Sequence, residues 1–242
     1  MNKYFNREFS WLEFNKRVLE IFDRDRLSMG EKAKFISIFC SNLDEFYMVR
    51  VGSLWDQSRN PETEPDISGL LPGAQLERIA KRAKELSGEC YSRFGRLKAD
   101  FAEKQIFLQG MEDLAALEQQ YLESFFKSHI YPQLTFRLID EEREFPLIKN
   151  KTLNLFVRLK KEGKLCWGNV QIPENENRLI EISGRKERKF ILLEDLIAGN
   201  LNFLFDGYLI EENCCYRITR NADLNYDEDE SKDLLSKIEK SI

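Results

Sequence analysis

The spacing of hydrophobic residues changes near residue 132, and this change limits the folds open to the chain. Before it, apolar side chains recur every three or four residues, most regularly between residues 76 and 101, as on the buried face of an α-helix. After it, aliphatic residues occupy every second position from 153 to 159 and alternate with Asn154, Phe156 and Arg158, which is typical of a β-strand. The sequence therefore predicts an α+β protein, with a helical N-terminal domain over 1–108 and a mixed head domain with a mainly antiparallel sheet over 109–242.

Capping signals predict where the first helices begin. Ser10 with Glu13, and Ser28 with Glu31, both fit the capping box, in which serine and glutamate side chains bond to each other's backbone N–H groups. We expect helices to begin at both serines. The first should have a hydrophobic staple between Phe9 and Phe14 and a buried stripe of Trp11, Phe14, Val18, Leu19 and Phe22. A short break is expected at Ser41 or Asn42.

The second half contains strand patterns and turn signals. We expect a hairpin turn at 160–164, because Gly163 lies between two alternating segments. The expected strands are 153–159, 165–172, 179–182 and 216–220. The expected helices run from about Glu194 to Phe205 and from about Asp227 onward.

Composition excludes several functional classes. The 242 residues contain 37 Lys and Arg against 42 Asp and Glu, a net charge of −5, so a general nucleic-acid binder is not expected. No apolar stretch approaches the roughly 18 residues of a membrane helix, and the N-terminus lacks a signal-peptide core. We therefore expect a cytoplasmic protein. Five cysteines without a CxxC pair predict neither a disulfide framework nor a zinc site.

Catalytic motifs are not found in the sequence. His129 is the single histidine, and its position near the end of a helical pattern is explained by the helix dipole. The chain has no Walker A loop, GxGxxG, HExxH or GxSxG. Acidic runs at 140–142 and 227–230 and the basic run at 185–189 are typical of solvated segments. We predict no catalytic residue and no metal ligand in this chain.

Asn42 is the one residue with two distinct interpretations. Its amide can pair with the exocyclic amine and a ring nitrogen of adenine, with Phe39, Phe46 and Tyr47 as apolar walls. Asparagine is also a preferred N-cap, and Glu45 follows at the capping-box position. Spacing alone favours the cap.

Several long segments resemble one protein family. Residues 4–19, YFNREFSWLEFNKRVL, are similar to the opening of the bacterial polyphosphate kinases that are phosphorylated on histidine. KFISIF and SNLDEFYMVRV, at 34–39 and 41–51, resemble the same family's N-terminal run. The stretches that resemble its second domain, in order, are 150–155, 193–197, 217–224 and 227–229.

The resemblance implies an enzyme that reversibly transfers the terminal phosphate of ATP to polyphosphate. It implies that Asn42 contacts adenine, which favours the nucleotide interpretation, with capping possible alongside. It also implies a cytoplasmic homodimer or larger homo-oligomer, with the phosphorylated histidine and the magnesium ligands in C-terminal domains that this chain lacks. We therefore expect an N-terminal piece, inactive alone, that supplies an adenine wall and a dimer surface. The alternative is a helical interaction module without ligand function.

Overall fold

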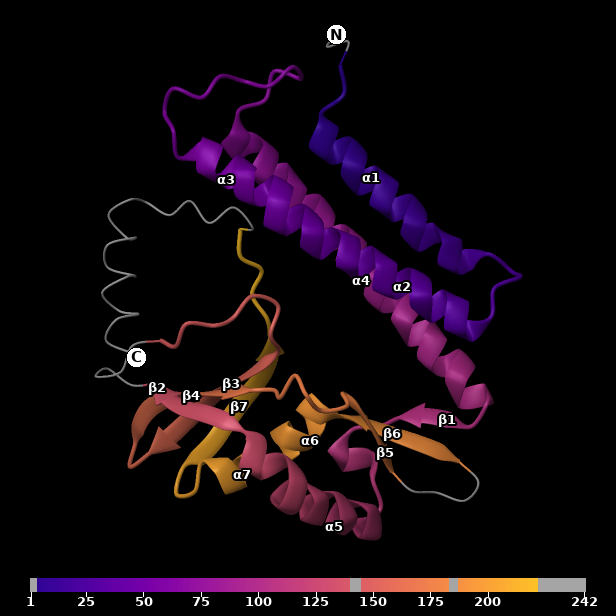
Figure 1. Ribbon diagram of the computed structural model, residues 1–242, viewed down its shortest axis with the longest axis vertical. Helices are drawn as coiled ribbons and strands as arrows, with labels where there is room; N and C mark the ends of the chain where they lie inside the picture. Colours follow the sequence, from indigo (N-terminus) through magenta and orange to yellow (C-terminus); the bar gives the residue numbers. More distant parts are fainter. Residues whose placement is uncertain (1–3, 140–144, 183–186, 222–242) are drawn as a thin grey trace. The chain divides into compact units, whose positions relative to one another are not determined.

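The computed structural model describes residues 4–139, 145–182 and 187–221, and it confirms the α+β class (Figure 1). These residues form two compact units. The helical unit contains residues 4–27, 34–90 and 219–221, and the sheet unit contains 28–33 and 91–218. The long helix α4 (Pro72–Glu103) contributes residues to both units.

The helical unit is built on α1 (Arg7–Glu20), α2 (Met29–Phe46) from Lys34 onward, α3 (Gly52–Ser58) and the first part of α4. A five-residue π-helical segment, η2 (Tyr47–Val51), joins α2 to α3. The buried residues of its core are Leu12, Leu19, Phe39, Phe46, Leu54, Ile79, Leu86 and Cys90.

Helix α1 begins earlier than its sequence predicts. Asn6 is the N-cap, and its Oδ1 accepts hydrogen bonds from the backbone N–H of Glu8 at 2.9 Å and of Phe9 at 3.0 Å. Ser10 lies inside the helix and donates its hydroxyl to the Asn6 carbonyl oxygen. The predicted cap and staple at Ser10 are therefore wrong, because a better placed upstream cap lets the helix form one turn sooner.

The buried face of α1 confirms only part of the predicted stripe, in which Leu19 and Phe22 are buried as expected. Leu12, Asn15 and Leu19 are buried, whereas Phe14 is 48% exposed. These three residues are spaced by three and four positions, so they follow one helical face.

Helix α2 confirms one predicted start and removes a predicted break. Ser28 and Glu31 exchange the capping-box bonds, with Ser28 N donating to Glu31 Oε2 at 2.8 Å and Glu31 N donating to Ser28 Oγ at 3.3 Å. The helix then continues unbroken through Ser41 and Asn42. No glycine or proline lies between residues 31 and 46, and the distortion comes later, at η2.

The sheet unit contains two sheets. Four antiparallel strands pair in the order β2 (Thr135–Ile139), β4 (Lys164–Gln171), β3 (Asn154–Lys161) and β7 (Leu209–Tyr216). In the other sheet, β6 (Arg188–Leu192) pairs parallel with β1 (Ile106–Leu108) and antiparallel with β5 (Leu179–Ile182). Helices α5 (Ala116–Phe125), α6 (Leu193–Gly199) and α7 (Leu201–Leu204) share a hydrophobic core with strands β2 to β7.

The β3–β4 hairpin confirms the predicted turn. Glu162 and Gly163 have consecutive positive φ values of 49° and 81°, as a type I′ turn requires. Leu155 pairs with Val170 farther along the ladder. Inward residues at 155, 157 and 159 are buried, so the period of two is confirmed.

Other predictions in this unit were less accurate. The strand expected at 216–220 is wrong, since β7 covers Leu209–Tyr216 instead and exposes most of its side chains, which weakens its alternation. The expected helix from Glu194 is divided into α6 and α7 at Asn200. The helix expected from Asp227 lies outside the described residues.

Candidate functional site

Three side-chain pairs connect α1 with the continuous segment formed by α2 and η2. Each step of three or four residues along α1 matches a step in the opposite direction along α2–η2. The helices are therefore antiparallel at this interface, and the facing side chains form an amide pair, an aromatic pair and an ion pair. The pairs are Asn15 with Asn42, Trp11 with Phe46, and Glu8 with Arg50.

Asn15 places a polar side chain in the middle of the helical core. It is 0% exposed, and its Nδ2 donates to the Phe39 carbonyl oxygen at 3.1 Å. Its Oδ1 accepts a hydrogen bond from Asn42 Nδ2 at 3.1 Å. A buried amide needs such partners to offset its lost hydration.

Asn42 lies inside α2 and does not begin a helix, so the predicted capping role is wrong. Its side chain is half-buried, and one N–H is used by Asn15. In the part of the chain that the structure describes, its second N–H and its Oδ1 have no hydrogen-bond partner. This leaves one donor N–H and one acceptor oxygen on the amide, the two kinds of group that the base contact requires.

The expected aromatic walls are mostly core residues. Phe39 and Phe46 are 1% and 2% exposed, and Phe46 stacks on Trp11 with ring centroids 4.4 Å apart. They cannot flank a base, because both rings are buried in the helical core and are not accessible to a ligand. Tyr47 is half-buried, and burial raises the pKa of its hydroxyl.

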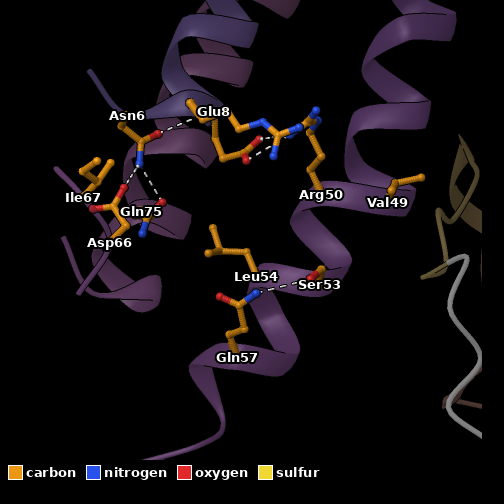
Figure 2. A pocket seen from close by; sticks show the side chains of 11 residues that line it. Asn6, Glu8, Val49, Arg50, Ser53, Leu54, Gln57, Asp66, Ile67 and Gln75 are labelled. Atoms are coloured by element: carbon orange, nitrogen blue, oxygen red, sulfur yellow. Dashed lines mark hydrogen bonds and ion pairs between the residues drawn. The ribbon is translucent and has the colours of Figure 1, made fainter. Parts of the chain in front are cut away.

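A pocket of about 550 Å³ lies farther along the same interface, beside the start of α1 (Figure 2). Arg50 Nη1 lies 3.2 Å from Glu8 Oε1 on one wall. On another wall, Asn6 Nδ2 donates to Asp66 Oδ2 at 2.8 Å and to Gln75 Oε1 at 2.7 Å. Asn42 is not among the lining residues, so the pocket and the Asn42 amide are separate features.

Asp66 organises the loop that forms one side of this pocket. Burial alone would raise the pKa of its carboxyl, but hydrogen bonds from Ser68, Leu70 and Asn6 outweigh burial and lower it. The carboxylate therefore stabilises the loop in its ionised form. The two carboxylates of the pocket are held by separate partners, Glu8 by Arg50 and Asp66 by Asn6. The pocket therefore has neither an activated nucleophile nor a paired general base.

His129 lies far along the sequence from these residues, in the sheet unit. Its ring stacks on Phe125 at 5.1 Å, and its Nε2 is 3.3 Å from Glu176 Oε1. It belongs to the last helical turn after α5, as the sequence predicts. Its side chain is 54% exposed, so its contact with Glu176 lies at the surface.

Two features are absent from residues 4–139, 145–182 and 187–221. No three histidine, cysteine, aspartate or glutamate side chains in these ranges lie close enough together to hold a metal ion. No helix there has both the length and the apolar character that a bilayer-spanning helix needs.

Sequence reasoning missed Asn6, Asn15 and Arg50. A usable signal exists for Asn15, because it occupies the buried face between Leu12 and Leu19. A polar residue at such a position predicts a specific hydrogen-bond partner.

Comparison with known proteins connects this arrangement to a family. Residues 4–109 match the family model of the polyphosphate kinase N-terminal domain, and residues 117–242 match that of the polyphosphate kinase middle domain. The chain belongs to the polyphosphate kinase family. The resemblance found in the sequence is therefore confirmed.

Individual polyphosphate kinases show how far the similarity extends. The protein from Exiguobacterium sp. is 38% identical over 247 residues, covering 100% of this chain and 34% of the relative. The Bacillus anthracis protein is 40% identical over 252 residues, covering 99% and 35%. The crystal structure of the Porphyromonas gingivalis enzyme matches with a TM-score of 0.80 and 28% identity, covering 93% and 34%. The chain thus spans about a third of the length of these polyphosphate kinases.

Proposed function

We propose that this chain is the N-terminal and middle part, with domains 1–108 and 109–242, of a cytoplasmic enzyme that transfers the terminal phosphate of ATP reversibly to polyphosphate. In this proposal Asn42 contacts the adenine of ATP. The observation that carries it is the half-buried Asn42 amide, which presents an acceptor and a donor without partners among the described residues. That pair complements the amine and an adjacent ring nitrogen of adenine.

The proposal assigns adenine recognition to this chain and phosphoryl transfer to other domains. Phosphoryl transfer needs positioned cations and a nucleophile acting on one phosphorus. His129 is exposed and paired with Glu176, which favours a surface role. The phosphate-accepting histidine and the magnesium ligands would lie in further domains, and ATP and polyphosphate would be the substrates.

Saturation-transfer NMR with ATP tests the adenine contact, because it detects weak binding and reports which nucleotide protons touch the protein. We expect saturation of the adenine protons with the unsubstituted chain and its loss in Asn42→Ala. Equal saturation of both proteins, or none with the unsubstituted chain, would refute an adenine contact by this chain. As a separate test, incubation with γ-labelled ATP should leave the purified chain unlabelled.

A second role, as an association surface, is favoured by the edge strand β7. It pairs with β3 on one side, and most of its side chains are exposed. Unpaired strand edges promote strand-to-strand association. Light scattering should therefore show a dimer or larger species, whereas a monomer at all concentrations would exclude this role.

A further inference from the structure

We infer that Asn15 is a positioning residue that fixes the orientation of the Asn42 amide and thereby selects adenine over guanine. This inference rests on the adenine contact proposed above. It assigns a specificity role to a fully buried side chain that does not itself touch the nucleotide.

The polarity of the hydrogen-bond chain is set by the protein backbone. The Phe39 carbonyl oxygen can only accept a hydrogen bond, so the Asn15 amide must present its Nδ2 to it. The Asn15 Oδ1 is then directed to Asn42, which must donate from Nδ2. Rotating the Asn42 amide by a half-turn would bring its Oδ1 against Asn15 Oδ1, placing two acceptors in contact.

The fixed amide leaves one defined edge for a ligand. Asn42 Oδ1 can accept from the amine of adenine while its remaining N–H donates to ring nitrogen N1. On the equivalent edge, guanine places a carbonyl oxygen against Oδ1 and an N–H against Nδ2. Guanine would match only the rotated amide, which Asn15 prevents.

Burial makes this control effective. Asn15 is 0% exposed, so water cannot readily replace it as the partner of Asn42. Stability does not demand a polar residue there, because a leucine of similar size would pack against Leu12 and Leu19 on the same face. An asparagine at this position is therefore better explained by its effect on Asn42.

Matched variants separate positioning from packing. Asn15→Leu removes both hydrogen bonds and keeps the volume, so the chain should stay folded, bind ATP about tenfold more weakly and lose its preference for ATP over GTP. Asn15→Asp keeps an acceptor for Asn42 and lacks the donor for Phe39, so it should be less stable and keep the preference. Leu19→Ala, on the same buried face, is the control: it should lower stability and leave the preference unchanged.

Two further measurements connect the effect to Asn42. In an Asn42→Ala background, Asn15→Leu should cause no additional loss of ATP binding, as a double-mutant cycle requires. In NMR spectra without nucleotide, the Asn42 side-chain N–H groups should exchange with solvent faster in Asn15→Leu. If that variant does not fold, Asn15→Ala removes the same bonds and serves instead.

The outcomes distinguish the two proposals. If Asn42→Ala weakens ATP binding and Asn15→Leu leaves the ATP preference intact, the positioning role is overturned and the adenine contact stands. If the unsubstituted chain does not bind ATP, or Asn42→Ala has no effect, both are overturned. Loss of preference in Asn15→Leu but not in Leu19→Ala supports the inference.

Discussion

Replacing Phe46 with alanine should destabilise the helical unit strongly, because the structure makes this ring part of the core. Phe46 is 2% exposed and stacks on Trp11 with an interplanar angle of 10°. Truncating a buried phenylalanine costs about 3–5 kcal/mol. Of this loss, about 0.5–1.5 kcal/mol should belong to the ring pair. A loss of this size is a large share of the roughly 5–15 kcal/mol that stabilises a domain.

Urea unfolding followed by circular dichroism measures this loss. Phe14→Ala, on the same helix as Trp11 but with a ring that is 48% exposed, is the control and should stay within about 0.5 kcal/mol of the unsubstituted chain. A double-mutant cycle of Trp11→Ala with Phe46→Ala should recover the coupling of the pair. A loss below about 1 kcal/mol for Phe46→Ala, with weaker ATP binding, would refute this reasoning and restore Phe46 as a base wall.

Three other predictions follow from local geometry. An alanine Cβ at Gly168 would lie 2.5 Å from a buried aromatic ring, whereas at Gly88 nothing lies within 4 Å; Gly168→Ala should therefore cost about 1–3 kcal/mol and Gly88→Ala should stabilise by about 1 kcal/mol, seen as opposite shifts of the urea midpoint. The Cys40 and Cys90 sulfurs lie 3.9 Å apart, and the two residues are 50 positions apart in the sequence. Oxidised glutathione should therefore form a disulfide between them and raise the free energy of unfolding by up to about 4 kcal/mol. If Cys90→Ser loses as many free thiols on oxidation as the unsubstituted chain, this prediction is contradicted. Hydrogen bonds lower the pKa of Asp66 below its ordinary 3.8. The contribution of this carboxylate to the free energy of unfolding should therefore be full above pH 3.8 and disappear as the pH falls through the lowered pKa. Urea unfolding of Asp66→Ala should lack this acid-dependent loss of stability, and an acid profile unchanged by the substitution would argue against it.

The fold class could be predicted because each half repeats one period over many residues. The stripe of α4 and the alternation of β3 each report burial on one face, and burial follows side-chain chemistry directly. The β3–β4 turn was predictable because Gly163 tolerates the positive φ that the turn requires. Strand β7 was missed because most of its side chains are exposed, so buried and exposed positions do not alternate regularly along it.

The candidate site was only partly predictable. Asn42 was selected from the sequence by its chemistry and by resemblance, but its partner Asn15 lies 27 residues away. Nothing local shows that α1 and α2 place these two amides together. The cap at Asn6 was missed for a different reason, since Ser10 offers an equally good local signal and only the folded backbone decides between them.

The anchor of the Asn15–Asn42 pair is the main-chain oxygen of residue 39, and this limits which substitutions can disturb it. A change of the Phe39 side chain to another large apolar group leaves that oxygen in place, so the hydrogen bond does not require phenylalanine at residue 39. An insertion or deletion between residues 39 and 42 would rotate one group away from the other by about 100° per residue, given 3.6 residues per turn. Length in this short stretch should therefore be restricted more tightly than composition.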